Sequence, residues 1–434
     1  MLLDDARAVL AQSPVCDSCL GRPFADRSHG LTVAERGRAL RVGVALADDE
    51  PFEAPDPGDC WVCEGHCTQF DAWATRAAND LAEIEFETYQ VGTRVPPLIE
   101  ENERLLREDA ELDPDAGEAF KAEFNREVGR RLGGMLGVEV DFDRPDVLVI
   151  CDLEPDILEV QINPAFVYGR YRKLERDIPQ TEWPCRECHG SGTVGGEPCD
   201  HCGGSGYLYE HSVEQYVAPH VQEAMDGTDA LFHGAGREDV DALMLGTGRP
   251  FVVEVKHPYK RFPDLEGLEA EINEAAEGAV EVEGLRYATH EMVERVKELE
   301  ANKTYRAEIE FEGDIAPEAL ADALGALEGA TIEQRTPDRV SHRRADLVRT
   351  RTVHAIAGDL EDDRHATIEV EGAGGLYIKE LLHGDDGRTD PNLAALLGVE
   401  VTVTALDVIA VEAEDGTFEE PTFFREPGDD SKKS

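Results

Sequence analysis

The chain has 434 residues, of which 41% are hydrophobic, so it is long enough to bury a sizeable core and to hold two or more domains. Its 93 acidic and 42 basic residues give a formal net charge of −51, which normally argues against a nucleic-acid partner because phosphate binding depends on Lys and Arg. Since no apolar run is long enough to span a bilayer and the start of the chain does not resemble a signal peptide, we expect a cytoplasmic protein with no membrane partner.

The first cysteines form two Cys-x-x-Cys pairs: Cys16 with Cys19, and Cys60 with Cys63. Four thiolates suit a structural zinc ion, which is usually held in tetrahedral coordination. A disulfide framework is the alternative, but nothing in the sequence indicates secretion. His66 and Cys67 follow closely, and either could replace a member of the quartet. We therefore expect a zinc-binding segment over residues 1–70.

The next region has the pattern of a small α+β domain over residues 71–178. Residues 84–88 alternate like a half-buried strand, and residues 147–151 and 160–162 also resemble strands. An apolar residue recurs at every fourth position of one stretch, as on the buried face of a helix: Phe120, Phe124, Val128 and Leu132.

A repeated cysteine motif dominates residues 185–206. Each copy reads Cys-x-x-Cys-x-Gly-x-Gly, and the pairs are Cys185 with Cys188 and Cys199 with Cys202. The glycines permit the tight turns that bring four sulfur atoms round one metal ion, as in the zinc ribbon of DnaJ-type chaperones. We expect a second zinc site here, and such a knuckle can also bind single-stranded nucleic acid.

A Gly-rich turn then carries Arg237 and Asp239, which places a carboxylate near a guanidinium. Ser212 and Gln215 fit a capping box that begins the preceding helix, and residues 246–250 look like a tight turn leading into a buried strand at 251–255. Loop tips between rigid elements are common positions for reactive groups. The simpler interpretation of Arg237 and Asp239 is an exposed ion pair.

The C-terminal part predicts a mostly antiparallel sheet. Residues 302–311 alternate and place on one face Tyr305, Ala307, Ile309 and Phe311, and residues 348–354 and 367–370 are also strand-like. Residues after about Glu412 look like a solvated acidic tail, which we place at 413–434.

Two basic clusters stand out against the acidic composition. One contains Arg170, Arg172 and Lys173, and the other contains Arg343 and Arg344. Acidic residues spread through every segment are typical of halophile proteins, because concentrated salt shrinks the Debye length to about 3 Å. These five residues are therefore our candidates for RNA contacts.

Several of these segments together resemble pseudouridine synthases of the Pus ten family, which occurs in archaea and eukaryotes. The resemblance spans roughly residues 160 to 400 and rests on Gly236-Arg237-Glu238-Asp239 with Gly246-Thr247-Gly248-Arg249-Pro250-Phe251, Tyr168-Gly169-Arg170-Tyr171, Ile178-Pro179-Gln180-Thr181, Lys303-Thr304-Tyr305, Arg339-Val340-Ser341-His342-Arg343-Arg344, Tyr377-Ile378-Lys379-Glu380 and Gly387-Arg388-Thr389. The chain is identified as an archaeal, halophilic member.

The resemblance implies an α+β architecture. An N-terminal zinc-containing segment and a THUMP-type RNA-binding domain over 71–178 precede a pseudouridine synthase catalytic domain over 179–412. That domain has a mostly antiparallel sheet flanked by helices and carries the zinc knuckle at 185–206. The resemblance also favours the zinc site in the N-terminal part.

It further implies isomerisation of uridine to pseudouridine at positions 54 and 55 in the TΨC arm of tRNA, with Asp239 as nucleophile. Tyr305 would lie against the uracil ring, and Tyr377 and Arg237 would also contact the substrate. Either Lys379 or Arg388 would pair with the carboxylate.

No Gly-x-Gly-x-x-Gly fingerprint follows a strand, so we expect no organic cofactor. The sequence indicates no obligate protein partner. A non-catalytic, zinc-dependent RNA-binding or chaperone-like protein is the alternative. Such a protein would give no common function to the Asp239 loop, Tyr305 and Tyr377.

Overall fold

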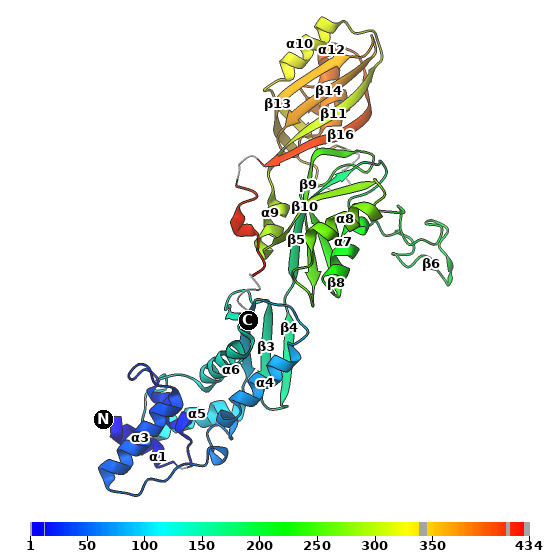
Figure 1. Ribbon diagram of the computed structural model, residues 1–434. Coiled ribbons are helices and arrows are strands. Elements are labelled where there is room, and N and C mark those ends of the chain that lie inside the picture. Colours follow the sequence, from blue (N-terminus) through cyan, green and yellow to red (C-terminus); the bar gives the residue numbers. More distant parts are fainter. Residues whose placement is uncertain (1, 13, 338–344, 414–416, 429–434) are drawn as a thin grey trace. The chain divides into compact units, whose positions relative to one another are not determined.

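A computed structural model describes the chain except residues 1, 13, 338–344, 414–416 and 429–434 (Figure 1). The chain divides into two compact units, Met1–Pro164 together with Gly428–Ser434, and Ala165–Pro427. The division lies earlier than the boundary at residue 178 that we expected from the sequence. The physical reason is that Ala165–Lys173 forms a strand inside the larger sheet of the second unit.

The N-terminal unit combines helices with a small sheet. Its elements are α1 (Leu2–Leu10), α2 (Asp17–Gly21), η1 (Arg22–Phe24), α3 (Val33–Asp48), η2 (Pro57–Asp59), η3 (His66–Thr68), α4 (Phe70–Asp80), β1 (Thr88–Arg94), α5 (Pro97–Asp109), α6 (Phe120–Leu136), β2 (Glu139–Val140), β3 (Val147–Asp152) and β4 (Ile157–Ile162).

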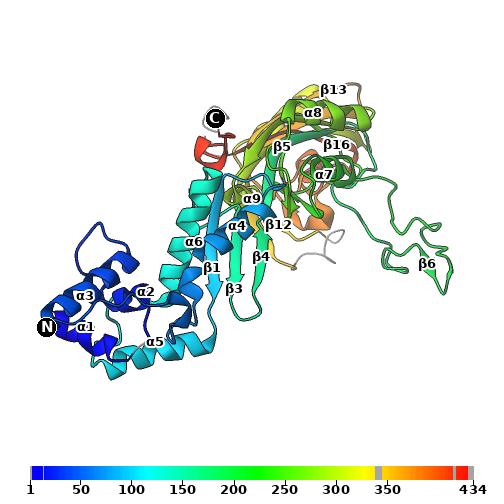
Figure 2. The same cartoon turned by 60° about the horizontal axis from the view of Figure 1, so that its bottom comes forward.

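Local signals account for several of these elements. The Thr32 side chain and Glu35 form a reciprocal capping box that begins α3. The expected apolar stripe of α6 is confirmed, because all four of its residues are buried in the core of this unit. The strand order is β2-β1-β3-β4, and α6 lies alongside β1 in Figure 2. The strand expected at residues 84–88 was wrong: β1 begins only at Thr88, and Phe86 is a buried loop residue that mimics strand alternation.

The second unit is built on one large sheet. Its elements are β5 (Ala165–Lys173), β6 (Thr193–Val194), β7 (Glu197–Pro198), α7 (Val213–Ala224), β8 (Asp229–Gly234), β9 (Met244–Lys256), α8 (Leu265–Ala275), β10 (Val280–Ala288), α9 (His290–Glu298), β11 (Ala301–Phe311), α10 (Pro317–Leu327), β12 (Thr331–Arg335), β13 (Val348–Leu360), β14 (His365–Gly372), α11 (Ile378–His383), η5 (Asp385–Gly387), β15 (Thr389–Asp390), α12 (Leu393–Leu397), β16 (Val401–Ala413) and η6 (Pro421–Phe423).

The strand order of this sheet is β10-β5-β9-β16-β11-β14-β13-β12-β15, and β8 also pairs with β9. Among the described strands of the sheet, only the short contact between β16 and β9 is parallel, which confirms the expected mostly antiparallel sheet. Residues 246–250 were expected to form a turn but lie within β9. Gly246 permits this path, because a Cβ atom there would lie 1.8 Å from the carbonyl oxygen of Ile409.

Helices cover the sheet in separate clusters. Strand residues of β5, β9 and β10 pack with α7 and α8 in one apolar cluster, whereas the alternate residues Phe166, Tyr168 and Val252 pack with α9 in another. Helices α10, α11 and α12 pack with β11, β13 and β14. Figure 1 shows α10 and α12 beside these strands in its upper part. Helix α7 begins at the expected Ser212 cap and continues through Pro219.

The expected solvated tail was wrong for three phenylalanines of residues 417–427, a segment whose other residues are mostly exposed. Phe418 is buried and, with Phe423 and Phe424, packs against the cluster that contains α9. The carboxylate of Glu419 accepts hydrogen bonds from Tyr168 and Arg170. Burial of these apolar side chains is favourable, and the acidic average composition of the segment gave no indication of it.

Among the residues that the structure describes, no helix combines the length and the apolar character needed to cross a bilayer.

Candidate active site and metal centres

A cavity of about 300 Å³ lies in the second unit beside the loop that follows β8. Its lining brings together Trp183, Arg237, Glu238, Asp239, Val240, Ala242, Arg249, Lys303, Tyr305, Gly375, Leu376, Tyr377, Ile378, Leu406 and Val408. Segments far apart in the sequence therefore meet at Asp239, whose side chain remains 37% exposed. The loop turns at Gly236, whose φ of 73° favours glycine, and a Cβ atom there would lie 3.3 Å from the Nη1 atom of Arg249.

Of the two basic candidates, Lys379 lies beside the Asp239 carboxylate. Its Nζ atom lies 3.6 Å from Oδ2 of Asp239 and 3.1 Å from Oδ2 of Asp241. Arg388, the other candidate, donates to the carbonyl oxygen of Thr336, and its Nε atom lies 3.6 Å from Oδ2 of Asp385. The guanidinium of Arg237 lies over the ring of Trp183, 4.9 Å from its centroid.

Both expected tyrosines line the cavity. Tyr305 comes from β11, where Ala307, Ile309 and Phe311 on the same face are buried as expected. Burial, with the nearby carboxylate of Asp239, raises the pKa of Tyr305 to about 12, although Arg249 opposes the shift. Its hydroxyl therefore stays protonated at neutral pH.

The side chain of Gln334 fixes the backbone of Tyr377. Its amide nitrogen donates to the Tyr377 carbonyl, and its oxygen accepts from the Tyr377 N–H, both at 2.8 Å. Gln334 is itself buried, so this pair of bonds is protected from water.

The sequence reasoning missed a buried ion pair next to Asp239. Glu238 Oε2 lies 2.8 Å from Nε of Arg249, and both side chains are only 1% exposed. The contact is a close ion pair that is not aligned as a hydrogen bond. One signal was available: Arg249 directly precedes an apolar run, where a charged residue needs a partner.

The first basic cluster does not offer free cations to RNA. Arg172 pairs with Glu281 at 3.0 Å and with Glu283 at 3.1 Å, and Arg170 pairs with Glu419 at 3.0 Å. Lys173 is fully buried, so the expectation that it contacts RNA was wrong. The other two candidates, Arg343 and Arg344, lie outside the described residues.

Two groups of four cysteines have the geometry of a metal site, with all sulfur atoms of each group within 4.8 Å of one another. The groups are Cys16, Cys19, Cys63 and Cys67, and Cys185, Cys188, Cys199 and Cys202. The sulfur–sulfur distances are 3.9 Å for Cys16–Cys63, 3.9 Å for Cys185–Cys199 and 3.7 Å for Cys188–Cys202. They match the edge of a tetrahedron with metal–sulfur bonds of about 2.3 Å. Both groups therefore fit a tetrahedral thiolate-bound metal ion. The second group is the expected one, whereas in the first Cys67 replaces the expected Cys60.

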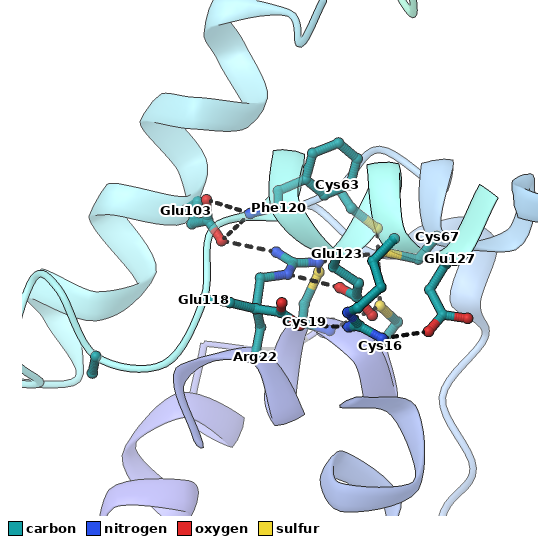
Figure 3. A network of polar contacts seen from close by, with 12 residues as sticks. Cys16, Cys19, Arg22, Cys63, Cys67, Glu103, Glu118, Phe120, Glu123 and Glu127 are labelled. Carbon is teal, nitrogen blue, oxygen red and sulfur yellow. Dashed lines mark hydrogen bonds and ion pairs between the residues drawn. The ribbon is translucent and has the colours of Figure 1, made fainter. Parts of the chain in front are cut away.

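A buried arginine connects the first quartet to the helices around it. Arg22 is 1% exposed; its Nη2 atom lies 3.4 Å from the sulfur atoms of both Cys19 and Cys67 (Figure 3). The same guanidinium donates to Glu123 at 2.9 Å and to Glu103 at 3.0 Å. Such outer contacts fix the orientation of metal ligands and offset part of their negative charge.

Comparison with known proteins identifies the family. The family model described as "Pus10, C-terminal" matches residues 166–412, and "Pus10 THUMP domain, archaeal" matches residues 73–152. A protein of Halorubrum lacusprofundi named tRNA pseudouridine synthase Pus10 is 63% identical over 425 residues, covering 98% of this chain and 100% of that protein. The chain belongs to the Pus10 family.

Other Pus10 relatives span nearly the whole chain. The protein of the same name from Methanothrix thermoacetophila is 43% identical and covers 94% of each chain; that of Pyrococcus furiosus is 38% identical and covers 95% of this chain and 98% of its own. A solved Cbf5-Nop10-Gar1 complex matches at a TM-score of 0.30 and 20% identity over 47% of each chain, which is too low to support a functional statement.

The Pus10 assignment confirms the expected archaeal family, its THUMP domain, and an enzyme of the isomerase class.

Proposed function

We propose that this Pus10 protein converts uridine to pseudouridine at positions 54 and 55 in the TΨC arm of tRNA, with Asp239 as the catalytic nucleophile. The observation that carries the proposal is the convergence of the partly exposed Asp239 carboxylate and two tyrosines on a single cavity, with the Lys379 ammonium 3.6 Å from that carboxylate. Relatives named tRNA pseudouridine synthase support tRNA as the substrate.

The reaction rearranges bonds within one nucleotide. The bond between N1 of uracil and C1′ of ribose breaks, the base turns, and C5 bonds to C1′; C5 then loses its proton, and N1 carries one in the product. The Asp239 carboxylate supplies an electron pair either to the ribose carbon or to the uracil ring, and it leaves again, so the net change is an isomerisation. The Lys379 ammonium, 3.6 Å away, places a positive charge beside this carboxylate.

The aromatic lining suits a base that has left its stack. Tyr305 and Tyr377 offer ring faces to the uracil, and Arg237 over Trp183 forms the rim. Because the Tyr305 pKa is raised to about 12, we assign its protonated hydroxyl to positioning and its ring to stacking.

We further propose that zinc occupies both cysteine quartets, since closed four-thiolate sites are typical of structural zinc. Bound there, the ion would hold chain segments together and take no part in the isomerisation. Arg343 and Arg344 remain our candidates for phosphate contacts, and the cytoplasm remains the expected compartment.

Asp239→Asn tests the central claim, because the amide keeps the shape but cannot act as an anionic nucleophile. We expect pseudouridine formation to fall below detection in carbodiimide mapping of a tRNA transcript, while the tRNA still binds. Asp241→Asn is the matched control on the same loop and should be milder. Full activity of Asp239→Asn would refute the role, and absence of pseudouridine with the wild-type chain would favour the non-catalytic alternative.

A further inference from the structure

Buried side chains donate hydrogen bonds to carbonyl groups of the loop that carries Asp239. These bonds add to two backbone bonds, from the Asp177 N–H to the Val240 carbonyl and from the Ala242 N–H to the Asp239 carbonyl. Along β5 the side chains alternate between faces, so Tyr171 and Lys173 share the face that meets this loop. Lys173 is 0% exposed, and its Nζ atom donates to three carbonyl oxygens: Ile178 at 2.8 Å, Asp239 at 3.3 Å and Val240 at 2.9 Å.

Burying an ammonium group is costly unless every donor is satisfied, and Lys has three donors. Here three carbonyl groups provide the acceptors. Burial lowers the pKa of Lys173, while the nearby carboxylates of Glu238 and Asp241 oppose the shift. A methionine of similar length would pack in the same space without this cost. The buried lysine therefore points to a requirement that packing alone does not explain.

Tyr171 contacts the same loop through Glu238. Its hydroxyl lies 3.0 Å from each oxygen of that carboxylate and donates to it. Burial raises the pKa of Tyr171 well above its usual value, and the carboxylate adds to the shift, so the phenol stays a donor. The carboxylate also pairs with Arg249, whose Nη1 atom donates to the carbonyl oxygen of Ala235 at 2.6 Å.

Two further donors complete the set. The Gln180 side chain donates to the Gly236 carbonyl at 2.9 Å, and Arg176 donates to the Asp241 carbonyl at 2.8 Å. Loop carbonyls on both sides of Asp239 are thus bonded to side chains, which fixes where its carboxylate can point.

We propose that Lys173 and Tyr171 are positioning residues, which set the direction of the Asp239 carboxylate through the loop backbone and through Glu238. Neither residue is among the described residues that line the cavity, so they act through other groups. The inference rests on the proposed role of Asp239. It also explains why a lysine in a basic cluster points into the core.

The test compares Lys173→Met and Tyr171→Phe with matched controls. Tyr168→Phe removes a buried hydroxyl that donates to a glutamate on the opposite face of β5, and Lys256→Met removes a lysine paired with Glu254 on β9. Single-turnover rates with saturating enzyme, tRNA affinity and thermal unfolding are measured for each variant, at a temperature where all are folded.

A misplacement of about 1 Å lowers a catalytic rate by roughly 10²-fold. We therefore expect Lys173→Met to lose about that factor and Tyr171→Phe about tenfold, with tRNA affinity unchanged and both controls at the wild-type rate. A purely stabilising role would lower the unfolding temperature and leave the single-turnover rate of the folded protein unchanged.

Folded Lys173→Met with a rate within threefold of wild type would overturn the inference. If Lys173→Met does not fold, the single-turnover rate of Tyr171→Phe decides by the same criterion. An equal loss of rate in Tyr168→Phe would assign the effect to strand β5 as a whole and would also contradict the inference. Asp239→Asn is assayed alongside. Activity there refutes the proposed function, whereas an inactive Asp239→Asn with fully active Lys173→Met and Tyr171→Phe refutes only the positioning role.

Discussion

Replacing Arg22 by Met should destabilise the N-terminal unit far more than replacing a surface arginine. The guanidinium of Arg22 is 1% exposed and is the partner of Glu123, which is 2% exposed, and Glu103, which is 10% exposed. Removing one member of a buried ion pair leaves an uncompensated charge, which costs about 3–5 kcal/mol. Loss of the contacts to Cys19 and Cys67 adds a roughly 10–100-fold weakening of metal binding.

The measurement is urea unfolding in excess zinc, followed by tryptophan fluorescence. Trp183 is replaced by Phe in every variant, so that the signal comes from Trp61 and Trp73 of the N-terminal unit. High salt should not abolish the loss, because buried charges are screened little.

A surface pair on α5 gives the control. Arg104 pairs with Glu101 and Glu108 on exposed positions, so Arg104→Met should show no measurable loss in concentrated salt. In the double variant Arg22→Met with Glu123→Gln, the more deeply buried of the two stranded charges is removed and part of the stability should return. A loss for Arg22→Met below about 1 kcal/mol, or a double variant no more stable than the single one, would contradict the ion-pair reasoning.

Two other predictions concern the tyrosine and the metal ligands. Tyr305→Phe should retain much of the single-turnover rate. Since the Tyr305 pKa is raised to about 12, the pH profiles of the wild-type and variant rates should stay parallel from pH 7 to about pH 10. A difference between the two profiles that grows in this range would implicate the ionised hydroxyl. Cys67→Ser should lower the zinc content from two ions to one per chain, whereas Cys60→Ser should keep both. The reverse result would restore the quartet expected from the sequence.

Periodic patterns were sufficient wherever one element decides the structure. The four-residue stripe of α6 and the alternation of β11 specify a buried face without any knowledge of the partner surface. The spacing of the second cysteine quartet likewise determined its members, because both pairs lie within one short hairpin. Asp239 as the candidate nucleophile came instead from the resemblance of the Gly-Arg-Glu-Asp segment to the catalytic loop of the family, and it stays a prediction.

The first quartet shows what spacing cannot decide. Cys60 and Cys67 flank Cys63 within a few residues, and the path of the chain determines which of the two joins Cys16, Cys19 and Cys63 in one compact group. Several cysteines in one short segment are equivalent in the sequence, and only the folded backbone separates them.

Direction of side chains was the other quantity that only the tertiary structure decided. Arg172 and Lys173 belong to one basic cluster in the sequence, yet adjacent residues of a strand face opposite sides, so one pairs with surface glutamates and the other enters the core. The acidic composition of the C-terminal segment likewise predicted a solvated tail, whereas Phe418 of that segment is buried. Local patterns determine which elements form, and the packing between distant strands determines whether a charge meets water, a carboxylate or the loop of Asp239.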